Sequence, residues 1–217
     1  MDQGAFTADG CPVEVYRLLP PDGEAGIVHA AVPEGASILE LGSGVGRVTH
    51  ALLALGHPVV AVDDSPEMLA HVRAEKVCSK IEELRLGRVF DAVLLGSHLI
   101  NTTLDADRAA FLATARAHVA PGGRVLVEWH PPEWFESVQD GQGGRIGEVD
   151  VRLGQVVRHG ELLSAVVRYS ADDRRWTQAF TCRRLGSAAL DTALTRAGLV
   201  FERWCADDRT WFSANPA

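Results

Sequence analysis

The chain has 217 residues, of which 47% are hydrophobic and 23% charged, a composition typical of a water-soluble globular domain. Its formal net charge of −8 argues against a phosphate backbone as the main partner, and no apolar run is long enough to cross a membrane. The 4 cysteines lack CxxC spacing, which predicts reduced thiols, and no cluster of His, Cys and acidic residues has metal-site spacing. We therefore expect a cytoplasmic monomer or homodimer that binds a small molecule and neither nucleic acid, membrane nor metal.

Apolar runs alternate with helical patterns through the first part of the chain. Helical patterns cover Val45–Leu55, Pro66–Ala74 (with Ser65 as N-cap) and Asp105–Val119, the last stopped by Pro121-Gly122-Gly123. Strands separated by helices of this length predict a parallel sheet with helices on both faces. The expected strands are Ile38–Leu41, Pro58–Asp63, Val77–Cys78, Phe90–Leu95 and Arg124–Trp129.

The most informative segment, residues 38–47, is an apolar run that passes Glu40 and then breaks into alternating glycines. Glycine is required where the backbone takes a positive φ or where a ligand approaches closer than a Cβ permits. Because a helical pattern follows, a nucleotide-like ligand is expected against this turn. Asp63 ends the next strand about twenty residues later, the distance expected of a carboxylate that holds ribose hydroxyls. The glycines are Gly42, Gly44 and Gly46.

Beyond about residue 145 the pattern changes to apolar–polar alternation, which predicts antiparallel strands over Glu148–Arg158, Glu161–Tyr169 and Arg175–Arg184. A helix over Ser187–Ala197 and two closing strands, Leu199–Cys205 and Arg209–Phe212, complete the chain.

These patterns predict one domain over residues 1–217. Within it we expect a helical N-terminal cover (1–30), a ligand-binding half (31–130), an insertion with antiparallel strands (131–185) and a closing helix with strands (186–217). The glycine-rich segment 137–147 is expected to form a mobile cover over the site.

Four segments, in this order and at these separations, carry a family resemblance: residues 40–46, 62–69, 90–93 and 120–126. On these segments the chain resembles class I S-adenosylmethionine-dependent methyltransferases of the small-molecule type. The resemblance implies S-adenosyl-L-methionine (SAM) as cofactor. It also implies a Rossmann-like three-layer α/β sandwich with a mostly parallel seven-stranded sheet and an antiparallel last strand, to which the alternating segment adds a small antiparallel β insertion.

The resemblance also implies the residues that hold the cofactor. Asp63 would bind both ribose hydroxyls, Met68 and Ile81 would sandwich the adenine, and Gly96 and Ser97 would lie near the amino group and the transferred methyl. The residues placed beside the methionine and ribose portions are Glu40, Gly42, Ser43, Gly44 and Gly46.

The resemblance departs at Lys80, where many relatives carry an aspartate that accepts the adenine amino group. A lysine only donates, so either Glu82 or Glu83 substitutes, or a backbone carbonyl does.

Three further residues have two readings each. Asp64 either touches the adenine edge or is an exposed turn acid, and Arg47 either pairs with the cofactor carboxylate or is solvated. Tyr16, on the amphipathic stretch Val13–Leu19, either covers the cofactor or packs in the core.

His98 and His130 are the catalytic candidates, because each follows a predicted parallel strand at the edge where open α/β sheets bind ligands. Histidine is suited to proton transfer near neutral pH, although either residue could instead only shape the pocket. Asn101 either orients a substrate or caps a turn. Trp134, beside Pro131-Pro132, is expected to contact a flat, apolar or cationic acceptor.

We therefore expect methyl transfer from SAM to an oxygen or nitrogen of a small molecule in secondary metabolism. A nicotinamide-dependent oxidoreductase is one alternative, but the glycine spacing differs from GxGxxG. The other is a non-catalytic cofactor-binding protein, which would bind without turnover.

Overall fold

The computed structural model describes residues 6–7 and 10–217, so that residues 1–5 and 8–9 of the expected N-terminal cover lie outside the described part. Its helices are α1 (Val13–Leu18), α2 (Glu24–Ala31), α3 (Arg47–Ala54), α4 (Pro66–Leu69), α5 (Asp105–His118), α6 (Pro132–Ser137) and α7 (Ser187–Arg196), with single 3₁₀ turns η1 (Ile81–Glu83) and η2 (Leu99–Asn101). Its strands are β1 (Ile38–Leu41), β2 (Val59–Asp63), β3 (Glu75–Cys78), β4 (Phe90–Leu95), β5 (Val119–Glu128), β6 (Gly143–Ile146), β7 (Val149–His159), β8 (Leu162–Ala171), β9 (Arg174–Arg183), β10 (Leu199–Trp204) and β11 (Trp211–Pro216).

The main sheet has seven strands in the order β3-β2-β1-β4-β5-β11-β10. The strands from β3 to β5 run parallel, whereas β11 is antiparallel to both β5 and β10. This confirms the predicted Rossmann-like α/β fold with a mostly parallel sheet and an antiparallel last strand. The order of parallel strands changes direction between β1 and β4, and open sheets of this kind bind ligands at the carboxyl edge beside such a switch point.

The main sheet is the middle layer of a sandwich because its strands are apolar on both faces. In β2, Val60 and Val62 pack into the cluster that includes α5 and α7, while Val59 packs with α2 and α3. Ala61 packs under α4 through Leu69. Near-continuous apolar strands of this kind are what two-sided burial requires.

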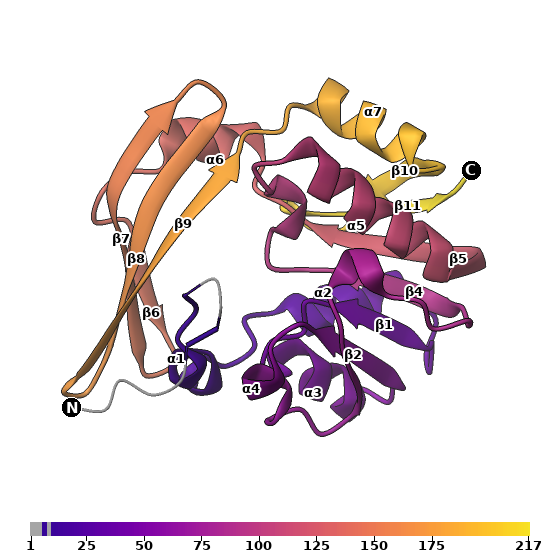
Figure 1. Cartoon of the computed structure of the whole chain (residues 1–217), viewed down its shortest axis with the longest axis horizontal. Helices are drawn as coiled ribbons and strands as arrows, with labels where there is room; N and C mark the ends of the chain where they lie inside the picture. Colours follow the sequence, from indigo (N-terminus) through magenta and orange to yellow (C-terminus); the bar gives the residue numbers. More distant parts are fainter. Residues whose placement is uncertain (1–5, 8–9) are drawn as a thin grey trace.

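The second sheet is antiparallel, with the order β6-β7-β8-β9, and forms the predicted insertion between β5 and α7. It stands to one side of the sandwich, with α1 against it (Figure 1). The two N-terminal helices therefore pack on different sheets. Val15 of α1 packs on Tyr169 and Trp176 of the insertion, whereas α2 packs on the main sheet.

Three local predictions were wrong. The helix that begins at Pro66 ends at Leu69 instead of Ala74, because the chain must turn into β3, and the Lys76 ammonium accommodates this by donating to the Leu69 and Val72 carbonyls. The proline–glycine segment at 121–123 does not separate helix from strand, since β5 already begins at Val119 and runs through it.

The third error concerns the expected mobile cover at residues 137–147, which is a strand at Gly143–Ile146. Gly143 has φ +147°, and a Cβ there would lie 2.0 Å from the Val151 carbonyl oxygen. The glycine thus permits close pairing of β6 with β7, a role that a composition rich in glycine does not distinguish from flexibility. Across the described residues, no helix is both long enough and apolar enough to span a bilayer.

Candidate active site

The glycine turn after β1 opens a cavity at the carboxyl edge of the sheet. Gly42 and Gly44 have φ of +74° and +55°, and the Gly42 and Ser43 amides donate to the Val62 carbonyl at 2.8 and 2.9 Å. A Cβ on Gly42 would lie 2.7 Å from Leu99, so that residue has no room for a side chain. A Cβ on Gly44 would meet nothing within 4 Å. Gly44 therefore leaves space on the side where a ligand would lie.

This glycine-loop cavity has a volume of about 440 Å³, within the range of small-molecule sites. Most of the residues predicted to hold the cofactor line it, while Gly46 and Gly96 do not. Gly46 instead precedes α3 with φ +81°, and Gly96 lies beside Glu128 at the end of β4. The predicted residues on the cavity wall are Tyr16, Glu40, Gly42, Ser43, Gly44, Arg47, Asp63, Asp64, Met68, Ile81, Glu82 and Ser97.

Asp63, the last residue of β2, connects the glycine turn to the start of α4. Its Oδ2 accepts the Gly44 amide at 2.8 Å, and its Oδ1 accepts the Ser65 amide at 3.0 Å. Ser65 in turn caps α4 by accepting the Met68 amide, as the sequence predicted. The carboxylate is thereby held in one orientation at the cavity wall.

Glu40 lies deeper beneath the turn and is buried. Its Oε2 accepts the hydroxyl of Thr49 from α3. Burial raises the pKa of Glu40 to about 7, although the Thr49 hydrogen bond and Arg47 oppose the shift. Glu40 is therefore a carboxyl group that changes charge near neutral pH.

An unsatisfied polar atom supports a ligand at this place. Ser43 Oγ is buried and has no hydrogen-bond partner among the described residues. Such atoms are rare in folded proteins and call for an explanation. With the open space above Gly44 and the fixed Asp63 carboxylate, the residues present fit a ligand that carries ribose hydroxyls and further polar groups.

At the other end of the cavity, Met68 and Ile81 provide apolar walls. Lys80 also lines the cavity, immediately before η1. Of the two acids that the sequence offered in its place, Glu82 lines the cavity and Glu83 does not.

Arg47 and Tyr16 are held by the protein itself. The Arg47 guanidinium pairs with Glu24 at 2.5 Å and donates to the Pro20 carbonyl at 2.9 Å. Arg47 is therefore engaged with the protein and is not a purely solvated side chain. The Tyr16 hydroxyl donates to Gln178 of β9 at 3.1 Å, and burial raises its pKa well above the usual value. Both side chains thus fasten the N-terminal segment around the cavity.

The two candidate catalytic histidines stack face to face. The ring centroids of His98 and His130 are 3.6 Å apart, and the Trp134 ring stacks on His130 at 3.7 Å. Burial, together with the neighbouring His98, lowers the pKa of His130 to about 2. His130 is therefore uncharged at neutral pH and too weak a base to take a proton there. Neither histidine lines the glycine-loop cavity, and Trp134 does not line it either.

His98 occupies a strained turn at the end of β4. Ser97 and His98 have consecutive φ of 53° and 54°, a left-handed conformation that costs a non-glycine residue on the order of 1 kcal/mol or more. The His98 Nε2 lies 3.7 Å from Glu128 Oε1, and Nδ1 is a second buried polar atom without a partner among the described residues. Burial lowers the pKa of His98, and the nearby Glu128 carboxylate opposes that shift.

Asn101 lies in the 3₁₀ turn η2 that follows His98, and it is buried. Its amide oxygen accepts the His130 backbone amide at 2.8 Å, and its NH₂ group donates to the carbonyls of His130 and Arg183. Asn101 therefore ties together the chain after β4, the end of β5 and the end of β9. Asn101 therefore holds the backbone of His130 and does not line the glycine-loop cavity.

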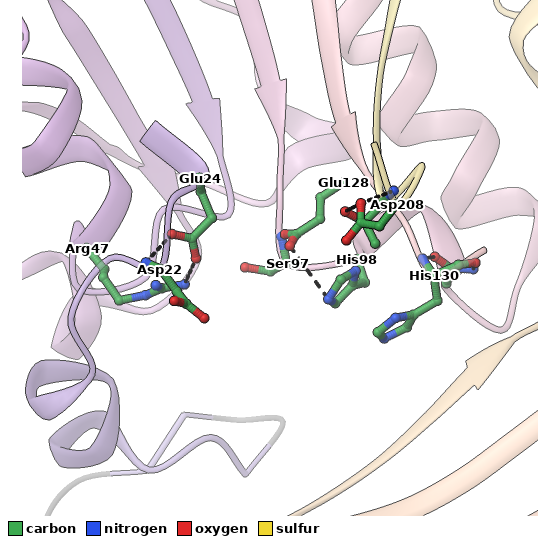
Figure 2. Close-up of polar contacts among 10 residues, drawn as sticks. Asp22, Glu24, Arg47, Ser97, His98, Glu128, His130 and Asp208 are labelled. Carbon is green, nitrogen blue, oxygen red and sulfur yellow. Dashed lines mark hydrogen bonds and ion pairs between the residues drawn. The ribbon is translucent and has the colours of Figure 1, made fainter. Parts of the chain in front are cut away.

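A second cavity, of about 450 Å³, lies on the other side of Ser97 and Arg47, and we call it the acidic cavity. Two contacts separate it from the glycine-loop cavity: the Ser97 amide donates to Glu128 Oε2 at 2.6 Å, and Arg47 pairs with Glu24 (Figure 2). The residues that line the acidic cavity are Asp22, Glu24, Ile27, Glu128, Ala206, Asp207, Asp208, Thr210 and Trp211.

Sequence reasoning missed Glu128 and the other acids of this cavity. Glu128 lies at the carboxyl end of a predicted parallel strand, so the rule that selected His98 and His130 would also have found it. Asp22, Asp207 and Asp208 lie on loops that only the tertiary fold brings together.

Comparisons with known proteins find methyltransferases. A family profile for a methyltransferase domain matches residues 39–127. An uncharacterized methyltransferase of Mycobacterium tuberculosis is 29% identical over 189 residues, covering 81% of this chain and 72% of the relative. The cypemycin N-terminal methyltransferase of a Streptomyces species is 27% identical over 161 residues, covering 68% of this chain and 64% of the relative.

A solved structure is similar over most of its length. It is a SAM-bound amino pentose methyltransferase from Micromonospora echinaspora that is involved in calicheamicin biosynthesis. The identity is 25% and the TM-score 0.68, with 89% of this chain and 88% of the other covered. Residues 39–127 therefore form a methyltransferase domain, and the chain is similar over most of its length to SAM-dependent methyltransferases. Its cofactor is SAM.

Proposed function

We propose that this enzyme methylates a nitrogen or oxygen atom of a metabolite-sized acceptor that enters through the acidic cavity. The observation that carries the proposal is the adjacency of two cavities that share a wall at Ser97 and Glu128. Two similar proteins support acceptors of this size, since one is named for an amino pentose and the other for the N-terminus of cypemycin.

The residues of the glycine-loop cavity are proposed to hold the cofactor. Asp63 would bind the ribose hydroxyls, Met68 and Ile81 would flank the adenine, and Glu82 is the acid placed to accept the adenine amino group. The glycine turn with Ser43, together with Glu40 and Ser97, would contact the methionine portion. When bound, SAM supplies a methyl group that its sulfonium already activates.

The work left to the protein is to position the acceptor, exclude water and accept a proton. Methylation of an amine or hydroxyl forms one bond to the methyl carbon as the carbon–sulfur bond breaks, and releases one proton with S-adenosylhomocysteine. We assign proton acceptance to His98, which is neutral at neutral pH because burial lowers its pKa. Stacking on His130 fixes its ring, and Glu128 stabilises its protonated form.

The test is release of S-adenosylhomocysteine in a coupled assay across panels of phenols, amines and carboxylates. On the best acceptor, His98→Asn is expected to lower kcat by about 100-fold, the lower range for loss of a general base. Asparagine tolerates the left-handed backbone that His98 adopts. His159→Asn, at the exposed end of β7, is the matched control and should keep full turnover. Full turnover by His98→Asn at every pH would refute the proton-acceptor role, and binding of SAM without turnover of any acceptor would refute catalysis.

A further inference from the structure

The acidic cavity has a large excess of negative charge. Five of the residues that line it are carboxylates, and no lysine, arginine or histidine lines it. Only Glu24 has an arginine partner, Arg47, which leaves Asp22, Glu128, Asp207 and Asp208 without an ion pair to lysine or arginine among the described residues. Clustered carboxylates repel one another unless a cation lies between them.

Glu128 is the member of this set that contacts the backbone of the glycine-loop cavity wall. Its side chain is 17% exposed, so water screens it only in part. Its Oε2 accepts the amide of Ser97, a residue that lines the glycine-loop cavity. Figure 2 shows Glu128 and Asp208 on the side of the site that carries Ser97 and His98, facing Asp22 and Glu24.

No charged group of the protein balances Glu128 at neutral pH. Within the described residues, the only ion-pair partner found for it is His98, at 3.7 Å. Burial lowers the pKa of His98, so this partner is uncharged at neutral pH. A largely buried carboxylate without a cation is unfavourable unless a ligand supplies one.

The backbone turn at Ser97 and His98 holds the Glu128 carboxylate in place. The consecutive left-handed residues Ser97 and His98 turn the Ser97 amide onto one carboxylate oxygen and the His98 ring toward the other. Strain of this kind persists where the surrounding structure enforces it, and it is typical of binding and catalytic sites. The turn therefore fixes the direction of the carboxylate at the boundary between the two cavities.

We propose that Glu128 is the specificity-determining residue for the acceptor, and that it selects a protonated amine by pairing with its ammonium group. The proposal rests on the proposed function, and it deepens it by naming the substrate class as cationic amines. Asp22, Asp207 and Asp208 supply the negative field that draws the amine into the cavity. The amine gives up one proton to His98 before its nitrogen takes the methyl group.

The test compares cations with neutral molecules of the same shape on protein saturated with S-adenosylhomocysteine. The probes are phenethylamine with 2-phenylethanol, and glucosamine with glucose, titrated by calorimetry or by saturation-transfer NMR. The wild type is expected to bind at least one amine at least about tenfold more tightly than its alcohol, a difference typical of a partly desolvated charge pair. Equal affinities within both pairs would overturn the proposal.

Glu128→Gln is the decisive variant because its amide oxygen can still accept the Ser97 amide. It should abolish the preference for the amine while leaving alcohol binding and S-adenosylhomocysteine affinity unchanged. A merely structural role would weaken both members of a pair together, and that result would also refute the assignment. Glu34→Gln removes the same charge from an exposed turn before β1 and should keep the preference.

Asp22→Asn is a second variant that does not depend on Glu128→Gln folding well, since Asp22 is exposed. It is expected to weaken amine binding by about two- to fivefold, in the manner of a rim charge, and this effect should shrink in high salt. The preference for amine over alcohol is measured by binding, so it tests the role of Glu128 without any measurement of turnover. Absence of turnover on every acceptor, with the preference intact, would instead count against the proposed methyl transfer.

Discussion

Two carboxyl groups hold the glycine turn, and the fold gives them different environments. Asp63 accepts two backbone amides and borders the cavity, whereas Glu40 lies beneath it with one hydroxyl donor from Thr49. Burial favours the neutral form of a carboxyl group. Glu40 therefore titrates near pH 7, whereas Asp63 is the carboxylate proposed to bind the ribose hydroxyls.

Glu40 should make stability depend on pH in a defined window. Its pKa is raised from 4.5 to about 7 on folding, so between these values the folded state binds more protons than the unfolded state. Stability then falls as pH rises through the window, by up to about 1.4 kcal/mol per pH unit, and the cost is absent below the unfolded pKa. Glu40→Gln should lack this term. We expect wild type to gain stability relative to Glu40→Gln as pH falls from 7.5 to about 4.5, measured by urea unfolding of the two proteins without cofactor.

The comparison between the two proteins cancels the titration of the other acids, which they share. Asp91, whose pKa is lowered by hydrogen bonds from Ser37, makes the stability of each protein rise with pH at lower pH, the opposite of the effect of Glu40. A constant difference between wild type and Glu40→Gln across this range would show that folding does not change the pKa of Glu40.

At the scale of elements, α1 is the part that joins the two sheets to one site. Tyr16 lines the glycine-loop cavity and donates to Gln178, whose own NH₂ group lies 2.8 Å from Cys11 Sγ. Tyr169 of β8 donates to the same Gln178 oxygen at 3.2 Å. A single amide on the insertion thus holds both ends of the segment that closes the cavity.

Gln178→Ala should therefore weaken cofactor binding although Gln178 does not line the cavity. Losing these hydrogen bonds costs roughly 1 kcal/mol each at most, so we expect S-adenosylhomocysteine to bind about three- to tenfold more weakly, measured by calorimetry. Thr177→Ala, at the exposed neighbouring position of β9, is the control and should bind normally. Unchanged affinity in Gln178→Ala would mean that α1 stays in place by apolar packing alone.

The elements also show what the sequence could predict. The fold class, β4 at its observed bounds and the residues around the glycine turn follow from local patterns, because apolar runs and glycines report burial and backbone conformation directly. The end of α4 and the strand β6 depend on specific contacts with the later residues Lys76 and Val151, which apolar periodicity and glycine content do not report. Asp22, Glu128 and Asp208 lie far apart in the sequence, so only the fold shows that they line one cavity.

At the scale of the whole molecule, the glycine-loop cavity draws its walls from several separate parts of the chain. The N-terminal segment contributes Cys11 and Tyr16, the main sheet contributes Asp63, and α5 contributes Phe111. A ligand bound here contacts all of them at once, so its binding free energy is shared by the sandwich and, through α1, by the insertion. Ligands that bind only the folded state stabilise it in proportion to the logarithm of their excess over Kd.

Thermal unfolding should report this stabilisation and identify the cofactor class. At a concentration of 100 times Kd, S-adenosylhomocysteine is expected to add about 2.7 kcal/mol, which for a chain of this size raises Tm by roughly 5–10 °C. NADH at the same concentration should leave Tm unchanged, because the turn lacks the dinucleotide spacing and SAM is the cofactor. Asp63→Ala should lose most of the shift, since it removes the carboxylate proposed to bind the ribose and frees the Gly44 and Ser65 amides. A Tm raised by NADH instead, or one raised equally in Asp63→Ala, would place the ligand elsewhere than on the glycine turn.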